Sequence, residues 1–236
     1  MVDLLSYIVV HTMLKPPLQG ILFDFDGLIL DTETPIFQAW QEMYRKYGEE
    51  LILADWAEIL GKSVEEMEPL KDFFRDLDSD NDQQAILEQI SRREIELVGK
   101  QRSLPGVTEL IQKARESGLK LGIVSSSDLK WVRTHLQRLR LEKFFDDVSC
   151  ADEVPKAKPD PALYHLGLKK MNLTPEKVVV LEDSPNGILS AKRAGLYCIA
   201  VPNQITRQLP YYKNGGAPDL ILDSLHSFPW DELMKD

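Results

Sequence analysis

The residues of this sequence that are best suited to chemistry are two pairs of carboxylates, each at the end of a short apolar run. Asp24 and Asp26 end the run at residues 20–26, and Glu182 and Asp183 end the run at residues 178–183. Side chains two apart on a strand point the same way, so Asp24 and Asp26 should project together from one strand end. Crowded carboxylates repel each other, and burial adds to the cost. A divalent cation that prefers oxygen ligands, such as Mg²⁺, would offset that repulsion.

A lone aspartate at the end of a strand usually serves in a turn or caps a helix. That alternative is weak for two acidic pairs on buried strands. If both strands are central and parallel, four carboxylates face one cavity at the sheet edge where open α/β folds bind ligands.

Two further segments have residues suited to phosphate. Ser125 and Ser126 begin the run SSSD at residues 125–128, where a hydroxyl and free backbone N–H groups at a strand-to-helix turn can hold a phosphoryl oxygen. We assign phosphate binding to Ser125, with Ser126 beside it, and a helix-capping role to Ser127 or Asp128. Lys158 precedes a proline at the start of a predicted helix; on its own it would be an ordinary exposed lysine.

The elements that must position these residues alternate between strands and helices. Apolar runs predict strands at residues 20–26, 119–125, 178–183 and 197–201, with weaker candidates at 145–150 and 220–222. Helical patterns lie between them at residues 107–117, 129–139, 161–171 and 186–194. This alternation predicts an α/β fold with a doubly wound, Rossmann-like parallel sheet.

One stretch interrupts the alternation. Residues 33–100 have helical periodicity and no good strand, so we predict an inserted all-helical cap domain. Its last segment carries the apolar residues Ile86, Leu87, Ile90, Ile95 and Leu97. The predicted core then consists of residues 1–32 and 101–236, with residues 1–18 as an extended leader.

Composition limits the partners. The sequence has 38 acidic and 28 basic residues and a formal net charge of −10, which disfavours general binding to nucleic acid or anionic membranes. No apolar run is long enough to span a bilayer, and the first residues lack the features of a signal peptide. Cys150 and Cys198 have no metal-site spacing and fit buried thiols in a reducing cytosol. We therefore expect a cytoplasmic protein without a nucleic-acid or membrane partner. We also predict a monomer whose partner is a small phosphorylated metabolite.

Four stretches together resemble the haloacid dehalogenase superfamily, in its branch of phosphatases and sugar phosphomutases with a helical cap. The matching stretches are residues 24–33 (DFDGLILDTE), 123–125 (IVS), 158–161 (KPDP) and 181–187 (LEDSPNG), in the family's order. The resemblance covers the chain from residue 20 to about residue 222, and the helical insert falls where that branch places its cap.

The resemblance implies roles for individual residues. Asp24 is implied as the nucleophile that attacks phosphorus, and Asp26 as the general acid for the leaving oxygen and then the base for water. Magnesium is implied to bind Asp24, the backbone carbonyl of Asp26 and Asp183, with Glu182 either a ligand or behind the ligands. These roles agree with the need of a carboxylate nucleophile for nearby positive charge.

The same resemblance implies that Ser125 and Lys158 hold the transferring phosphoryl group. It also narrows the reaction, because the superfamily's dehalogenases lack a carboxylate at the position of Asp26. We therefore predict a magnesium-dependent phosphatase of a sugar or polyol monophosphate that works through an aspartyl-phosphate.

The main alternative is a sugar phosphomutase resembling β-phosphoglucomutase. Such mutases carry a histidine where this chain has Ile36, and an arginine for a second phosphate where it has Val64. Lys62 is a candidate substrate-binding residue of the cap, with a solvated loop lysine as the alternative, and Arg92 or Arg93 are other possible clamps. A non-catalytic phosphometabolite-binding protein is a third hypothesis, disfavoured because the implied catalytic and metal-binding aspartates are all present.

Overall fold

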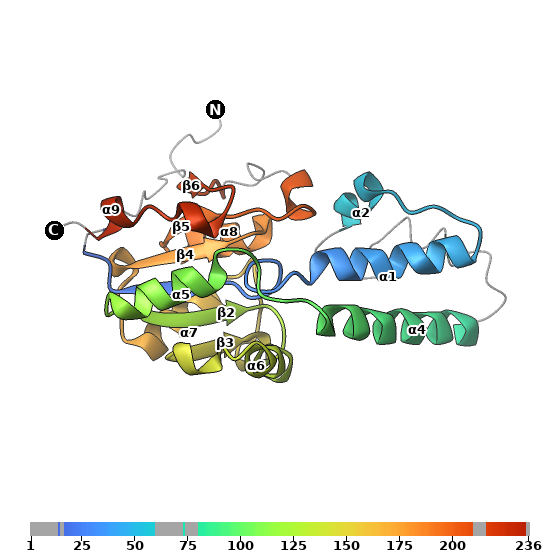
Figure 1. Ribbon diagram of the computed structural model, residues 1–236, viewed down its shortest axis with the longest axis horizontal. Helices are drawn as coiled ribbons and strands as arrows, with labels where there is room; N and C mark the ends of the chain where they lie inside the picture. The colour runs from blue at the N-terminus through green and yellow to red at the C-terminus, as the bar shows by residue number, and fades with distance from the viewer. Residues whose placement is uncertain (1–13, 15–16, 60–72, 74–79, 210–215, 235–236) are drawn as a thin grey trace, which may run out of the picture.

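Six short strands form one parallel sheet in the computed structural model, which describes residues 14, 17–59, 73, 80–209 and 216–234 (Figure 1). The strands are β1 (Gly20–Phe23), β2 (Lys120–Ser125), β3 (Asp147–Cys150), β4 (Val178–Glu182), β5 (Tyr197–Ala200) and β6 (Leu220–Ile221). Their order is β3-β2-β1-β4-β5-β6, and every neighbouring pair is parallel. The predicted strands are confirmed, including the two weaker candidates.

Helices cover both faces of the sheet. One face packs against α5 (Val107–Glu116), α6 (Leu129–Arg138) and the short α9 (Trp230–Leu233), and the other against α7 (Ala162–Met171) and α8 (Pro185–Arg193). Strands buried on both faces are expected to be continuously apolar, as the run VVVL of β4 is. Short 3-10 turns complete the core: η2 (Glu142–Phe144), η3 (Ala151–Glu153), η4 (Pro175–Lys177), η5 (Thr206–Gln208) and η7 (Leu225–Ser227).

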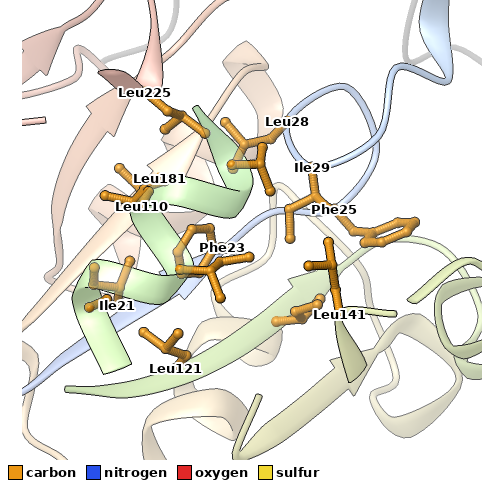
Figure 2. Close-up of a cluster of buried hydrophobic side chains, with 14 of the residues drawn as sticks. Ile21, Phe23, Phe25, Leu28, Ile29, Leu110, Leu121, Leu141, Leu181 and Leu225 are labelled. Carbon is orange, nitrogen blue, oxygen red and sulfur yellow. The ribbon is translucent and has the colours of Figure 1, made fainter. Parts of the chain in front are cut away.

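The first of these two faces carries the larger hydrophobic cluster. Figure 2 shows side chains from β1, β2, β4 and α5 meeting there, among them Ile21, Phe23, Leu121, Leu181 and Leu110. Ile21 and Phe23 point to this face, and Leu22 between them points to the other, as the period of two on a strand requires. β1 is therefore anchored from both sides, which fixes the position of the residues that follow it.

The cap is helical in its described part. It contains α1 (Glu33–Lys46), α2 (Leu53–Ile59) and α4 (Asp80–Gly99), and α1 and α4 lie side by side (Figure 1). These helices have their own hydrophobic cluster, which includes Ala39, Trp40, Met43, Tyr44, Trp56, Ile86, Ile90 and Leu97, and Ile205 of the core joins it. The described residues between 33 and 100 contain no strand. The predicted fold class, a parallel α/β core with an inserted helical cap, is confirmed, whereas the exact domain bounds remain a prediction.

The predicted leader, residues 1–18, lies mostly outside the described residues. Leu18 is described, and it is buried in the core, with its backbone N–H donating to the carbonyl of Leu233. Within the described ranges, none of the helices combines the length and the apolar character that crossing a bilayer requires.

Candidate active site

The sheet register brings the two acidic pairs together. Phe23 is the partner of Leu181 in the β1–β4 ladder, so Asp24 and Glu182 follow at the same level. The backbone N–H of Asp24 continues the ladder by donating to the carbonyl of Leu181 at 2.9 Å. Oxygens of Asp24, Glu182 and Asp183 all lie within 4.8 Å of one another, and all three residues are buried. Three of the four predicted carboxylates thus meet at the carboxyl edge of the sheet, and Asp26 is not one of these three.

Lys158 lies inside this acidic cluster. Its Nζ donates to Asp24 Oδ1 at 2.6 Å, to Glu182 Oε1 at 2.7 Å and to the carbonyl of Val124 at 2.8 Å. Burial opposes the charged form of Lys158, but the two carboxylates outweigh burial and raise its pKa. All three of its protons are used by the protein, so Lys158 supplies positive charge beside Asp24. Its predicted contact with a phosphoryl group remains a prediction.

The acidic cluster carries more negative charge than Lys158 neutralises. Burial, and then the charge of Glu182, raise the pKa of Asp24 to about 8, although Lys158 works against this shift. Burial, and then the charge of Asp24, raise the pKa of Asp183 well above its usual value. Closely spaced hard oxygen ligands with an excess of negative charge are the donor set that Mg²⁺ prefers.

Glu182 has its oxygens occupied by protein donors. Oε1 accepts from Lys158 and from the hydroxyl of Tyr164 at 2.7 Å. Oε2 accepts from the backbone N–H groups of Asp183 and Ser184, at 3.1 and 3.3 Å, and from the Ser184 hydroxyl at 3.2 Å. Since a carboxylate offers about four lone-pair sites, this one has none left for a metal. The geometry favours Glu182 as the group that orients Lys158.

Two positions in the family-matching stretches require glycine because of the acidic side chains beside them. Gly27 has φ +81°, and a Cβ there would overlap the carboxylate of Asp183. A Cβ at Gly187, in the first turn of α8, would overlap the carboxylate of Glu182. Glycine at both positions lets the backbone approach a buried carboxylate that no side chain would allow.

Asp26 is held by three donors, from the end of β2, from the turn that follows it and from α6. Its Oδ2 accepts from the hydroxyls of Ser125 at 3.2 Å and Ser127 at 2.7 Å, and its Oδ1 accepts from Trp131 Nε1 at 3.0 Å. The hydroxyl oxygen of Ser125 in turn accepts from the backbone N–H of Ser127 at 3.0 Å. The structure therefore brings Ser125, the last residue of β2, to Asp26, which lies three residues beyond the end of β1.

The other residues of the SSSD turn are divided between capping and exposure. Asp128 caps α6 by accepting from the backbone N–H of Trp131 at 2.7 Å, so Asp128 rather than Ser127 has the capping role. Ser126 is exposed. Its predicted role toward phosphate remains a prediction.

The cap residues singled out in the sequence are only partly described. Lys62 and Val64 lie outside the described residues, and Ile36 is partly buried against the hydrophobic cluster of the cap.

Three residues of the site were missed by the sequence analysis: Trp131, Tyr164 and Asn203. Asn203 Nδ2 donates to Asp183 Oδ2 at 2.8 Å and to the carbonyl of Gly27 at 3.0 Å. Asn203 lies just beyond the carboxyl end of β5, which pairs with β4. A polar residue after a predicted strand is expected at the ligand-binding edge of such a sheet, so this position could have identified Asn203. Tyr164 and Trp131 lie inside helical patterns, where an aromatic residue looks like ordinary core.

The chain matches a family model, several curated proteins and several solved structures. The model of a family described as haloacid dehalogenase-like hydrolase matches residues 21–201. YhcW of Bacillus subtilis is 34% identical over 82% of this chain and 88% of its own length. The phosphorylated carbohydrates phosphatase of Thermotoga maritima is 34% identical over 76% of this chain and 82% of its own length. A crystal structure of mutant CbbY from Rhodobacter sphaeroides, in complex with xylulose 1,5-bisphosphate, is 26% identical with a TM-score of 0.69, covering 92% of this chain and 100% of that chain.

Proposed function

The chain belongs to the haloacid dehalogenase-like hydrolase family, and from this premise we propose that it is a magnesium-dependent phosphatase of a small phosphorylated carbohydrate. The observation that carries the proposal is the buried contact of Asp24 with Lys158, 2.6 Å apart, beside Glu182 and Asp183. A carboxylate with adjacent positive charge is a suitable nucleophile for phosphorus. The relative that acts on phosphorylated carbohydrates supports the substrate class, a sugar or polyol monophosphate.

The carboxylates of Asp24 and Asp183 and the backbone carbonyl of Asp26 would hold Mg²⁺, which supplies positive charge against the phosphoryl oxygens. The fit rests on the raised pKa values of the two carboxylates, since a cation would relieve the repulsion that raises them. Glu182, occupied by five protein donors, holds Lys158 in place instead of binding the ion.

The reaction proceeds in two displacements at phosphorus. In the first, an Asp24 oxygen forms a bond to phosphorus, the bond from phosphorus to the sugar oxygen breaks, and Asp26 gives its proton to that oxygen. In the second, a water oxygen bonds to phosphorus, the Asp24–phosphorus bond breaks, and the proton lost by the water goes to Asp26. Ser125 holds a phosphoryl oxygen through both displacements, and the positive charge of Lys158 stabilises the negative charge of the phosphoryl group.

The proposed acceptor of the phosphoryl group is water and not a second sugar hydroxyl. A mutase must retain a bisphosphorylated sugar, and Ile36, where the related mutases have histidine, offers no donor and packs against the cap cluster. If β-glucose 1-phosphate with a trace of glucose 1,6-bisphosphate gave glucose 6-phosphate and little free phosphate, the mutase alternative would be correct.

Phosphate release from a panel of sugar and polyol monophosphates tests the proposal. The wild-type protein should release phosphate with Mg²⁺ and stop when a chelator is added. Asp24→Asn keeps the shape of the side chain but removes the charged nucleophile, so turnover should fall by orders of magnitude. Asp223→Asn is the matched control, because Asp223 belongs to the α/β domain but its side chain is 92% exposed to solvent. Full activity of Asp24→Asn, or trapping of phosphate on another residue, would contradict the proposed nucleophile.

A further inference from the structure

Trp131 makes a contact that its place in a helix does not require. Its indole Nε1 donates to Asp26 Oδ1 at 3.0 Å. The backbone N–H of Trp131 donates to Asp128, the residue that caps α6. Its ring makes a T-shaped contact with the ring of His135, with centroids 4.3 Å apart, and packs against the core cluster. The indole is thus a rigidly placed donor facing the carboxylate.

The two oxygens of Asp26 differ in what holds them. Oδ2 is held by the hydroxyls of Ser125 and Ser127, whereas Oδ1 accepts from Trp131. The hydroxyl of Ser125 has one proton, and the proposed phosphoryl contact competes for it. Binding of substrate therefore takes a donor away from Oδ2 and leaves the hold on Oδ1 unchanged. An indole N–H only donates and cannot exchange its proton with the substrate.

We propose that Trp131 is a positioning residue that holds Oδ1 of Asp26 and so makes Oδ2 the oxygen that carries the transferred proton. This inference rests on the proposed function, because it concerns the general acid and base of that reaction. In the first displacement the proton on Oδ2 moves to the sugar oxygen as its bond to phosphorus breaks. In the second, a proton of the attacking water returns to Oδ2. Without the indole donor, the carboxyl group rotates more freely and both transfers slow.

The test compares two leaving groups in Trp131→Phe, which keeps an aromatic ring and removes the N–H. A sugar alkoxide needs a proton to leave, whereas p-nitrophenolate leaves without one. The value of kcat/KM reports the first displacement, so it should fall about tenfold for the sugar monophosphate, the worth of one hydrogen bond. It should change little for p-nitrophenyl phosphate. The ratio of the two values in one preparation is independent of how much of the protein is folded.

Two further variants separate positioning from packing. Trp230→Phe is the control, since Trp230 is also half-buried against the core cluster but belongs to α9, and it should leave the ratio at its wild-type value. In an Asp26→Asn background, Trp131→Phe should cause no further loss for the sugar monophosphate, because residues that act through one group are not additive.

Equal losses for both substrates, no loss in Trp131→Phe, or full additivity with Asp26→Asn would overturn the inference and leave the proposed function standing. A wild-type protein without magnesium-dependent activity on either substrate would instead refute the proposed function itself.

Discussion

At the scale of single residues, the site depends on Lys158 and the hydrogen-bond donors near it, which lower the free-energy cost of burying several carboxylates. Lys158 contacts Asp24 and Glu182, and Tyr164 and the start of α8 occupy the remaining oxygens of Glu182. A buried charge is costly unless it is paired and hydrogen-bonded. Glu182 is fully paired in this way, whereas burial and the charge of Asp24 still raise the pKa of Asp183. The excess negative charge therefore lies at Asp24 and Asp183, where the metal is proposed to bind.

Asn203 is expected to tune that metal site. Its Nδ2 fixes Asp183 Oδ2, and its Oδ1 accepts from the backbone N–H groups of Ile205 and Thr206 at 2.9 Å. Residues that orient a metal ligand typically change metal affinity by about 10–100-fold when they are removed. Asn203→Ala should thus weaken Mg²⁺ binding by about that factor, measured by calorimetric titration of the purified protein.

Asn186→Ala is the matched control for that titration, because Asn186 is exposed in the first turn of α8. Its magnesium affinity should equal that of the wild-type protein. An unchanged affinity in Asn203→Ala would show that Asp183 needs no such support.

The aspartates of the site were predictable from the sequence, because a carboxylate shows its chemistry by its residue type. Asp24 and Asp183 lie together because strand ends meet in a parallel sheet. The partners of those acids were less accessible. Trp131 and Tyr164 act through a single polar atom on a ring that otherwise packs in the core, and the direction of that atom depends on three-dimensional contacts. Whether Glu182 binds metal or lysine was likewise undecidable from its place beside Asp183.

At the scale of elements, the cap depends on the contact between α1 and α4. Ile90 of α4 is 2% exposed within the hydrophobic cluster of the cap, whereas Ile95 of the same helix is 58% exposed. Ile90→Ala should lower the free energy of unfolding by about 2–5 kcal/mol, the usual cost of such a truncation in a core. Ile95→Ala, the matched control, should change it by less than about 0.5 kcal/mol. Denaturant unfolding followed by circular dichroism measures both, and equal effects of the two variants would contradict this packing of α4.

The same helix shows where a sequence pattern loses precision. The sequence pattern placed the apolar side chains between positions 86 and 97 in one helical segment, but Ile95 is exposed. Five residues separate it from Ile90, about 500° of helix rotation at 3.6 residues per turn, so the two point in clearly different directions. Strands gave a clearer signal, because those of this sheet are buried on both faces and appear as continuous apolar runs. The contact of Ile205 with the cap was not predictable, since it joins segments more than a hundred residues apart.

At the scale of the whole molecule, an acidic protein with net charge −10 is proposed to bind an anionic substrate. The net charge and an anionic substrate are compatible, because Lys158 and the proposed cation would set the local field at the active edge more than distant surface charge does. The cap and core also contact each other through the segment that follows β5. Asn203 of that segment contacts Asp183, and Ile205 lies in the cap cluster. The edge where the metal is proposed to bind and the cap are therefore linked by three consecutive residues.

Stability of the whole protein should report the state of the acidic cluster. The pKa of Asp24 is raised by burial to about 8, from 3.8. That of Asp183 is raised as well. In the metal-free protein the folded state therefore binds more protons than the unfolded state from about pH 4 to about pH 8, so this contribution to stability is present at low pH and is lost as the pH rises through that window.

Magnesium removes the cause of this loss, because a cation bound to the ionised carboxylates replaces the protons. The difference in Tm between protein with Mg²⁺ and protein with chelator should accordingly be small near about pH 5 and should grow toward about pH 8. Taking the difference cancels every titrating group that does not sense the metal. Asp183→Asn, which removes one of the crowded charges and one ligand, should flatten the dependence on pH, whereas Asp223→Asn should leave it intact. Thermal unfolding with and without Mg²⁺, from about pH 5 to about pH 8, measures this difference. A magnesium-induced shift in Tm that is equal at the two pH values would mean that the carboxylates of the cluster are not the groups that bind the ion.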